Sequence, residues 1–370
     1  MKEKYFVRTF GCKTNQYESQ LIKELVEKSG NFVSEEYRDA DVVVINSCAV
    51  TQPAERDVYK FIRRVYRDSK SFKKIILTGC YAEYIKLHNL EEKFFSRLGL
   101  NIQVEFLKNN EKYSFIKDLN ETQKFITKFF GYKRAYVKIQ DGCDNFCSYC
   151  IVPYLRKKLY SKPKNVVLKE VESLVNNGYN EIYLVGINIG KYSDFYNDKK
   201  YDYIDLSKEI LDSFEKVVLI YSSLEVVDLN YKFFYFLEEY KDRIFPHFHI
   251  PLQSADDKIL ASMKRKYSSE FYLDKINKIR KIIPEVIISC DLIVGYPEET
   301  KESFLKSLEF IKKVRFSWVH VFPYSPREGT ESYKKYGNFV CYDAKQRVRE
   351  VNILNKSLGE KCFKEICKVQ

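Results

Sequence analysis

The chain has 370 residues, of which 45% are hydrophobic and 31% are charged; this balance is typical of folded protein, leaves room for two domains and excludes wholesale disorder. No apolar run approaches the roughly 18 residues of a membrane span, and the charged start lacks the apolar stretch of a signal peptide, so the sequence argues against membrane and secreted classes. The net charge of +12 favours a polyanionic partner such as nucleic acid, although a genomic bias toward lysine is an alternative source of the charge.

The first part of the chain alternates short apolar runs with amphipathic stretches. Alternation of this kind is typical of a small parallel α/β domain, which we expect at residues 1–125. Residues 100–130 are polar and aromatic without a clear period, and they predict an irregular connection. The expected strands are 5–10, 42–45 and 75–77, and the expected helices are 17–28 and 53–66.

Each of these strands is followed by a small or turn-prone residue and then a cysteine; we call Cys12, Cys48 and Cys80 the N-terminal triplet. Ligand sites in open parallel sheets gather at the carboxyl ends of the strands, so we expect these three thiols to meet at one edge. Considered singly, each would more often be a buried core thiol. Considered together, they predict a cluster site with three thiolate ligands.

From residue 134, six expected strands alternate with five expected helices. Six βα units cannot close an eight-stranded barrel, so we expect an open, partial (β/α)6 barrel at residues 130–335, followed by a helical tail at 336–370. The expected strands are 135–140, 181–185, 217–222, 248–252, 286–293 and 318–322, and the expected helices are 165–177, 206–216, 231–240, 269–282 and 300–314.

A second group of cysteines, Cys143, Cys147 and Cys150, follows the first barrel strand directly; we call it the barrel triplet. Three closely spaced thiolates can hold three irons of a [4Fe–4S] cluster and leave the fourth iron open. A structural zinc site is the alternative, but it would normally need a fourth Cys or His nearby. The spacing resembles the signature of radical S-adenosylmethionine (SAM) enzymes, in which the open iron binds SAM, and Tyr149 fits the aromatic position of that signature.

The ordered motifs of the chain resemble those of the methylthiotransferases, a radical SAM family that adds a methylthio group to tRNA or to a ribosomal protein. The resemblance covers essentially all 370 residues. The motifs that carry it lie at 9–19, 46–51, 78–82, 140–154, 185–190, 222–225, 249–254, 291–300 and 320–325.

This resemblance implies that the cofactors are two [4Fe–4S] clusters and SAM. It assigns the SAM-cleaving cluster to the barrel triplet and a second cluster, which carries the inserted sulfur, to the N-terminal triplet, while a second SAM molecule supplies the methyl group. It assigns no catalytic side chain. It also implies a SAM pocket at the strand ends, for whose residues turn glycines and helix caps are the alternative roles; the candidates are Gly186, Ser223, Glu225, Gln253, Asp291 and Gly295.

Within the family, the motifs at 11–18, 141–142 and 222–225 look most like the MtaB branch, which acts on threonylcarbamoyl-adenosine in tRNA. The implied function is conversion of that nucleoside, beside the anticodon, to its 2-methylthio derivative. The implied partners are tRNA, a sulfur donor and a reductase or flavodoxin-type electron donor, in the cytoplasm and without a membrane.

Two other functions remain open at this point. Sister branches of the family modify isopentenyl-adenosine in tRNA or an aspartate of a ribosomal protein. An alternative of another class is a non-catalytic metal-cluster module that binds RNA.

The sequence departs from the family pattern in two places. Lys162 replaces an arginine and loses its bidentate fork, which puts a substrate or cofactor contact there in doubt. The family usually ends in a small RNA-binding β-barrel called TRAM, which we expect to be missing because the sequence stops about where that barrel would start. The basic runs at 157–158 and 264–266 either meet phosphates or form a solvated face.

Overall fold

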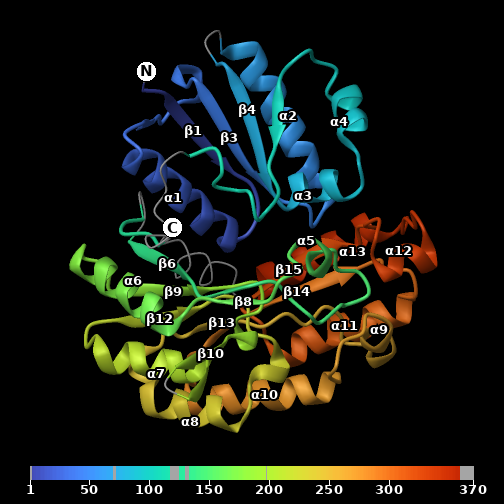
Figure 1. The fold of residues 1–370 in the computed structure, drawn as a ribbon. Helices are drawn as coiled ribbons and strands as arrows, with labels where there is room; N and C mark the ends of the chain where they lie inside the picture. Colours follow the sequence, from blue (N-terminus) through green and yellow to red (C-terminus); the bar gives the residue numbers. More distant parts are fainter. Residues whose placement is uncertain (1, 70–71, 117–124, 130–132, 197, 359–370) are drawn as a thin grey trace. The chain divides into compact units, whose positions relative to one another are not determined.

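The computed structural model describes residues 2–69, 72–116, 125–129, 133–196 and 198–358. The chain divides into two compact units (Figure 1). The first unit contains Met1–Ile126 and Ile151–Lys157, and the second contains Thr127–Cys150 and Lys158–Gln370. A short segment from the middle of the sequence therefore belongs to the N-terminal unit.

The described part of the first unit is built on a five-stranded parallel sheet with the order β2-β1-β3-β4-β5. Its strands are β1 (Lys4–Thr9), β2 (Phe32–Val33), β3 (Val42–Ser47), β4 (Lys74–Gly79) and β5 (Val104–Phe106). Its helices are α1 (Lys13–Lys28), α2 (Gln52–Asp68), α3 (Cys80–Leu87), α4 (Glu91–Leu98) and the short α5 (Val152–Leu155). The expected parallel α/β architecture is confirmed.

Strand β3 forms the centre of this sheet, and its first four residues, Val42 to Ile45, are apolar. All six of its residues are buried, as is typical of a parallel strand covered by helices on both faces. Strand β5 corrects the expectation of an irregular connection at 100–130, since it pairs with β4 in parallel. A strand of three residues is too short to show a period. Residues 117–124 and 130 of that stretch lie outside the described residues.

The strand order creates a topological switch point between β1 and β3. From β1 the chain passes through α1 to β2 on one side, whereas β3, β4 and β5 follow one another on the other side. In sheets of this kind, ligands bind in the crevice outside the carboxyl ends of the strands on either side of the switch. The N-terminal triplet follows β1, β3 and β4, so it lies at this edge.

The described part of the second unit contains six parallel barrel strands, in two groups of three. The groups have the orders β12-β9-β6 and β13-β14-β15, and an isolated parallel bridge from Leu219 to Ile244 connects them next to β13. The strands are β6 (Arg134–Lys138), β9 (Glu181–Val185), β12 (Val218–Tyr221), β13 (His247–His249), β14 (Ile287–Val294) and β15 (Trp318–Pro323). The open, partial barrel expected from the sequence is confirmed.

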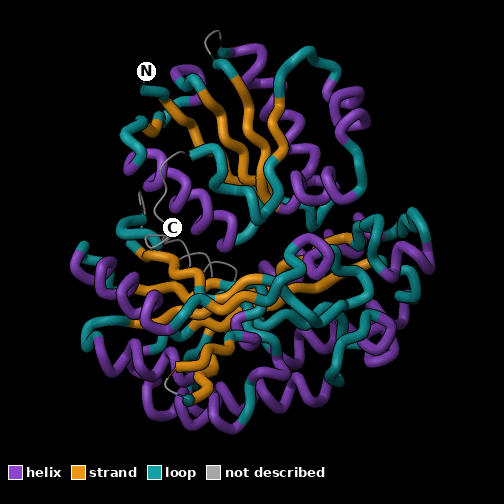
Figure 2. Tube along the Cα trace, viewed as in Figure 1, coloured by secondary structure: helices purple, strands orange, loops and turns teal. Residues whose placement is uncertain are grey.

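Helices cover one side of these strands (Figure 2). The expected helices are present as α6 (Lys164–Asn176), α7 (Tyr203–Ser213), α8 (Tyr231–Tyr240), α10 (Ser269–Ile282) and α11 (Lys301–Val314). The described part of this unit also contains the short helices α9 (Asp257–Ser262) and α12 (Glu331–Tyr336). Helix α13 (Ala344–Ser357) lies in the expected tail. Residues 359–370 of the tail, which include Cys362 and Cys367, lie outside the described residues.

Two small antiparallel pairs were not expected from the sequence. They are β7 (Gln140–Asp141) with β8 (Tyr160–Ser161), and β10 (Ser193–Tyr196) with β11 (Lys199–Asp202). Among the described residues, no helix has both the length and the apolar character needed to cross a lipid bilayer.

Candidate cluster and cofactor sites

The N-terminal triplet sits where three neighbouring strands end. Its members precede α1, follow β3 and begin α3, and the strand register pairs Asn46 with both Thr9 and Thr78. The three thiols are close enough for the charges of Cys12 and Cys80 to act on the thiol of Cys48. The structure therefore brings the triplet together at the switch point, while its role in binding iron remains a prediction.

Gly79 permits this close approach of the strand ends. Its φ of +88° lies in the left-handed region, and a Cβ atom there would lie 2.4 Å from the backbone oxygen of Ser47 and 2.5 Å from Oδ1 of Asn46. A side chain at this position would push the end of β4 away from β3. The glycine thus sets the spacing between Cys48 and Cys80.

Two sulfurs of this triplet accept N–H hydrogen bonds. The backbone nitrogen of Val50 donates to Cys48 Sγ over 3.5 Å, and Arg156 Nε donates to Cys80 Sγ over 3.3 Å. Burial raises the pKa of Cys48 to about 12. Burial also raises the pKa of Cys80, against the opposing charge of Arg156. Iron removes such protons when it binds, and both N–H donors then face thiolates, which suits a cluster at this site.

Arg156 is part of a buried network of charges. Its Nη1 donates to Glu18 Oε1 over 2.9 Å, and its Nη2 donates to Glu18 Oε2 over 3.1 Å and to Asn15 Oδ1 over 3.0 Å. Lys112 forms a second ion pair with Glu18. Sequence analysis missed Glu18 and Lys112 because 94 residues separate them and their partnership depends on the fold. Asn15 and Glu18 share one face of α1, since they are three residues apart.

The barrel triplet lies on the loop that follows β7. Cys150 N donates to the oxygen of Cys147 over 2.9 Å, and Phe146 adopts a φ of 45°. Ser148 fixes the loop to the second unit, because its backbone nitrogen donates to the oxygen of Met263 over 3.1 Å. Tyr149 packs against a buried apolar cluster that includes Met263. The aromatic residue noted in the sequence therefore anchors the loop in the barrel core.

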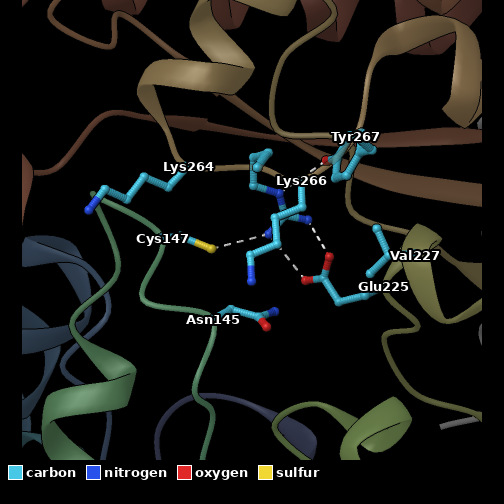
Figure 3. A pocket seen from close by; sticks show the side chains of 8 residues that line it. Asn145, Cys147, Glu225, Val227, Lys264, Lys266 and Tyr267 are labelled. Carbon is cyan, nitrogen blue, oxygen red and sulfur yellow. Dashed lines mark hydrogen bonds and ion pairs between the residues drawn. The ribbon is translucent and has the colours of Figure 1, made fainter.

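Arg265 connects this loop with Glu225. In Figure 3, dashed lines lead from the labelled Cys147 and Glu225 to the side chain between them. Its Nη1 donates to Cys147 Sγ over 3.4 Å and to Glu225 Oε1 over 3.2 Å, and its Nη2 pairs with Glu225 Oε2. The arginine side chain is 4% exposed. With Asn145 and Tyr267, these residues line a small cavity. The expectation that the basic run 264–266 meets phosphates or forms a solvated face is therefore wrong for Arg265.

Burial also raises the pKa of Cys143, and the backbone N–H of Asn145 opposes this effect.

Two buried oxygen atoms on the segment that follows β12 are free to bind a ligand. Among the described residues, Ser222 Oγ, just after β12, and Asp228 Oδ2, at the end of η4 (Val226–Asp228), are buried without a hydrogen-bond partner. Unsatisfied buried polar groups are costly unless a ligand completes them. This part of the barrel thus fits a polar cofactor such as SAM.

Three of the predicted SAM-pocket residues lie at the carboxyl ends of β9 and β12. Gly186 follows β9, and a Cβ atom there would lie 2.8 Å from Ile189 Cγ2 and 3.0 Å from the Gln140 side chain. Ser223 is half-buried on the loop after β12, and Glu225 lies on the same loop. The structure therefore groups these three residues on adjacent strands.

Gln253 and Asp291 lie together on the other half of the barrel. Gln253 has a φ of 66°, and its backbone nitrogen donates to the oxygen of Asp291 over 2.8 Å. The Asp291 carboxylate lies 3.2 Å from His249 Nε2, and His249 Nδ1 is 3.0 Å from Ser289 Oγ. Asp291 is thus already held by a histidine from the neighbouring strand.

Gly295 has a structural explanation that does not involve a cofactor. Its φ is +74°, and a Cβ atom there would lie 2.7 Å from the Cys341 Cβ. Its backbone nitrogen donates to Glu299 Oε2 over 2.5 Å. The turn after β14 accounts for this glycine, and its predicted place in the SAM pocket remains untested.

Lys162 forms a buried ion pair with Glu170 over 2.5 Å, and the side chains are 7% and 0% exposed. The lysine therefore has an internal partner at the position where the family has arginine.

Among the described residues, no three Cys, His, Asp or Glu side chains are placed to hold one metal ion. A [4Fe–4S] cluster does not need that placement, because each cysteine binds a different iron.

Comparisons with known families agree with this architecture. Residues 137–311 match the Radical SAM superfamily, and residues 4–98 match Uncharacterized protein family UPF0004. The two matches fall on the barrel and on the N-terminal sheet.

Related proteins match across nearly the whole chain. The threonylcarbamoyladenosine tRNA methylthiotransferase MtaB of Bacillus subtilis is 35% identical over 340 residues, which cover 87% of this chain and 73% of that protein. The tRNA-2-methylthio-N(6)-dimethylallyladenosine synthase of Fervidobacterium nodosum is 34% identical over 369 residues, which cover 93% and 81%.

Solved structures share the fold at low sequence identity. The radical SAM methyltransferase TsrM from Kitasatospora setae, with cobalamin and a [4Fe–4S] cluster bound, superposes with a TM-score of 0.59 at 10% identity. The superposition covers 87% of this chain and 75% of that chain. The cobalamin-dependent radical enzyme OxsB gives 0.58 at 10% identity, covering 96% and 56%.

The open barrel and its three-cysteine loop are those of the radical SAM class. Within that class, the chain belongs to the methylthiotransferase family, as its two family matches and its relatives at about 35% identity show. It is therefore an enzyme whose cofactors are SAM and two [4Fe–4S] clusters.

Proposed function

We propose that this enzyme methylthiolates threonylcarbamoyl-adenosine beside the anticodon of tRNA. The observation that carries the proposal is the pair of cysteine triplets, one at the carboxyl ends of parallel strands and one on the loop after β7, each with a buried arginine donating to one sulfur. A methylthiotransferase needs two such sites, one for radical generation and one for sulfur. The branch is supported by the MtaB-like motifs at 11–18, 141–142 and 222–225 and by an MtaB relative at 35% identity.

We assign the six cysteines as cluster ligands, with the barrel triplet binding the SAM-cleaving cluster and the N-terminal triplet the other. When bound, these groups supply the electron that cleaves SAM and the sulfur that is inserted. The protein's part is to bind, orient and exclude water. Residues 1–125 would then form the sulfur-carrying domain and 130–335 the radical domain, with 336–370 as the tail.

The barrel residues act by holding SAM against the open iron. Ser222 and Asp228 offer polar atoms that the described protein leaves unbonded, and Gly186 lets the chain after β9 pack closely against Ile189 and Gln140. Ser223, Glu225, Gln253, Asp291 and Gly295 remain proposed pocket residues. Arg265 holds Glu225 and donates to Cys147, so it fixes the cavity wall beside the cluster loop.

The other requirements of the reaction come from partners. The net charge of +12 favours tRNA, because each phosphate that a cation neutralises releases counterions. A flavodoxin-type or reductase electron donor and a sulfur donor would complete the cycle in the cytoplasm.

A second candidate substrate is dimethylallyl-adenosine in tRNA. The Fervidobacterium nodosum relative is nearly as similar as the MtaB relative and covers more of the chain. Overall identity therefore does not separate the two branches.

Mass spectrometry of tRNA nucleosides tests the proposal. In cells that lack the gene, 2-methylthio-threonylcarbamoyl-adenosine should disappear, and it should return with the wild-type gene. A gene with the barrel triplet changed to alanine is the matched control and should not restore it. Loss of the methylthio dimethylallyl nucleoside instead would assign the sister substrate, and an unchanged nucleoside profile would contradict both.

A further inference from the structure

Arg156 lies beside the N-terminal triplet and donates to one of its sulfurs. Arg156 comes six residues after Cys150 in the sequence, but with Ile151–Lys157 it belongs to the first unit. Its side chain is 2% exposed. Since arginine stays protonated even when buried, the fold places a permanent cation beside these cysteines.

The guanidinium of Arg156 is clamped so that one N–H faces a sulfur. Glu18 accepts from both Nη atoms, at 2.9 and 3.1 Å, and Asn15 Oδ1 accepts from Nη2 at 3.0 Å. Nε lies 3.3 Å from Cys80 Sγ. Because the guanidinium is planar, Nε–H cannot turn away from the sulfur without breaking a buried, charge-assisted hydrogen bond.

Asn15 and Glu18, the two residues that hold the guanidinium of Arg156, are themselves fixed at the edge of the sheet that carries the cysteines. Asn15 Nδ2 donates to the backbone oxygens of Phe10, over 2.8 Å, and Ser47, over 3.1 Å. Glu18 is held from another side by Lys112, and both of these side chains are at most 3% exposed. The position of the Arg156 donor is therefore set by the edge of the sheet.

The direction of the hydrogen bond indicates which state of the sulfur the site favours. A guanidinium has only donors, so Cys80 Sγ must be the acceptor. A neutral thiol is a weak acceptor, whereas a thiolate bound to iron accepts a charge-assisted bond. The arrangement suits a ligating sulfur better than a free thiol in a core.

The barrel triplet has a similar arrangement of arginine, glutamate and cysteine. Arg265 is clamped by Glu225 and donates to Cys147 Sγ over 3.4 Å. Arg156 follows α5 and Arg265 follows α9, so the two arginines come from unrelated elements. One buried arginine, one glutamate and one cysteine sulfur recur at both proposed cluster sites.

We propose that Arg156 is a positioning residue that tunes the second cluster, with its Nε–H donating to the Cys80 sulfur and raising the cluster's reduction potential. A donor to a ligand sulfur stabilises the reduced cluster, which carries more negative charge. Glu18 and Asn15 act by orienting this donor. The inference rests on the proposed function, in that the N-terminal triplet must hold a cluster.

The test isolates that cluster in the full chain. All variants carry alanine at the barrel triplet, so that iron and sulfide reconstituted anaerobically can occupy only the N-terminal triplet. The midpoint potential is then measured by redox titration followed by electron paramagnetic resonance. Circular dichroism and iron content accompany every sample.

Three variants separate the hydrogen bond from the charge. Arg156→Lys keeps the charge but loses the fork, Arg156→Gln loses both, and the matched control Lys112→Gln removes a cation from Glu18 without removing the donor to sulfur. Both Arg156 variants should lower the ratio of reduced to oxidised cluster at fixed ambient potential by about tenfold, as expected for a hydrogen bond to a charged group. Lys112→Gln should change it much less. Equal shifts in Arg156→Gln and Lys112→Gln, with none in Arg156→Lys, would overturn the hydrogen-bond role.

A second measurement needs no substitution at Arg156. With arginine labelled by 15N, pulsed electron paramagnetic resonance of the reduced cluster should detect a 15N coupling. A cluster that shows no such coupling overturns the inference and leaves the ligand assignment standing. Failure of any cluster to assemble on the N-terminal triplet would overturn both the inference and the assignment beneath it.

Discussion

Asp228, beside the proposed SAM pocket, is a single residue whose burial destabilises the protein when no cofactor is bound. Burial and, to a smaller extent, the charge of Glu225 raise the pKa of Asp228 from 3.8 to about 6, although Lys191 opposes the change. Oδ2 of this carboxylate has no hydrogen-bond partner among the described residues. A buried anion of this kind is expected where a ligand, absent from the unloaded protein, completes its hydrogen bonds.

This shift predicts the pH dependence of the Asp228→Asn variant without cofactors. Between about pH 6 and pH 4 the folded chain holds a proton on Asp228 that the unfolded chain does not, so wild-type stability rises as the pH falls through this window. Relative to Asp228→Asn, the wild type should gain about 1 to 3 kcal/mol between pH 7 and pH 4. Urea unfolding of both proteins at the two pH values measures this. Parallel changes in the two proteins would show that Asp228 is not the group responsible.

The ion pair between Lys162 and Glu170 gives a second prediction about single residues. Both side chains are nearly or fully buried, so Lys162→Met leaves an uncompensated carboxylate and should destabilise the second unit by about 3–5 kcal/mol. The double variant Lys162→Met with Glu170→Leu should recover most of that loss. Thermal unfolding of the three proteins measures the coupling. If the double variant is no more stable than the single one, the pair is not the source of the loss.

At the scale of elements, sequence periodicity located the strands and helices that contain enough residues to show it. Strand β9 (Glu181–Val185) and helix α8 (Tyr231–Tyr240) begin and end at the expected residues. Strand β5 and the two small antiparallel pairs were not expected, because two to four residues cannot display a period. The sequence assigns Arg156 no role, since its partners Asn15 and Glu18 lie about 140 residues away.

The turn at Gly79 yields a prediction about the edge of the sheet. Gly79→Ala puts a Cβ atom against the backbone of Ser47 in a left-handed conformation, so the turn must open and displace Cys80 from Cys48. Gly99→Ala is the matched control, since Gly99 has a φ of +67° but open space around its Cβ position. The control should cost about 1 kcal/mol.

The iron content of the Gly79→Ala and Gly99→Ala variants tests this prediction. Gly79→Ala should reduce the iron bound by the N-terminal triplet to well below the amount in Gly99→Ala, and it should unfold at a lower temperature. Equal iron content in both variants would show that the strand spacing set by Gly79 is not needed for cluster binding.

For the whole molecule, the division into two units separates the two cysteine triplets. The N-terminal triplet belongs to a doubly wound parallel sheet, and the barrel triplet belongs to an open barrel. The segment Ile151–Lys157 crosses this division, because it follows the barrel triplet in sequence and packs with the first unit. No pattern in the sequence indicates this exchange, since Ile151 and Leu155 are ordinary apolar residues of a short helix.

This division predicts that SAM cleavage and sulfur transfer can be separated. A chain in which Cys12, Cys48 and Cys80 are all alanine retains every ligand proposed for the SAM-cleaving cluster. Under anaerobic reduction it should still produce 5′-deoxyadenosine from SAM, with about half the iron of the wild type. It should form no methylthiolated nucleoside, because the proposed sulfur site is the cluster that this variant lacks.

The reciprocal variant, with the barrel triplet changed to alanine, should bind a similar amount of iron and form no 5′-deoxyadenosine. Because metal binding and folding are coupled, circular dichroism must show that each variant is folded before its products are compared. A folded N-terminal variant that still methylthiolates tRNA would mean that the second cluster is structural or absent. SAM cleavage that survives in the reciprocal variant would mean that the open iron has been assigned to the wrong cysteines. Only loss of the nucleoside in both variants, with 5′-deoxyadenosine lost in one, supports a radical site and a sulfur site that bind their clusters independently.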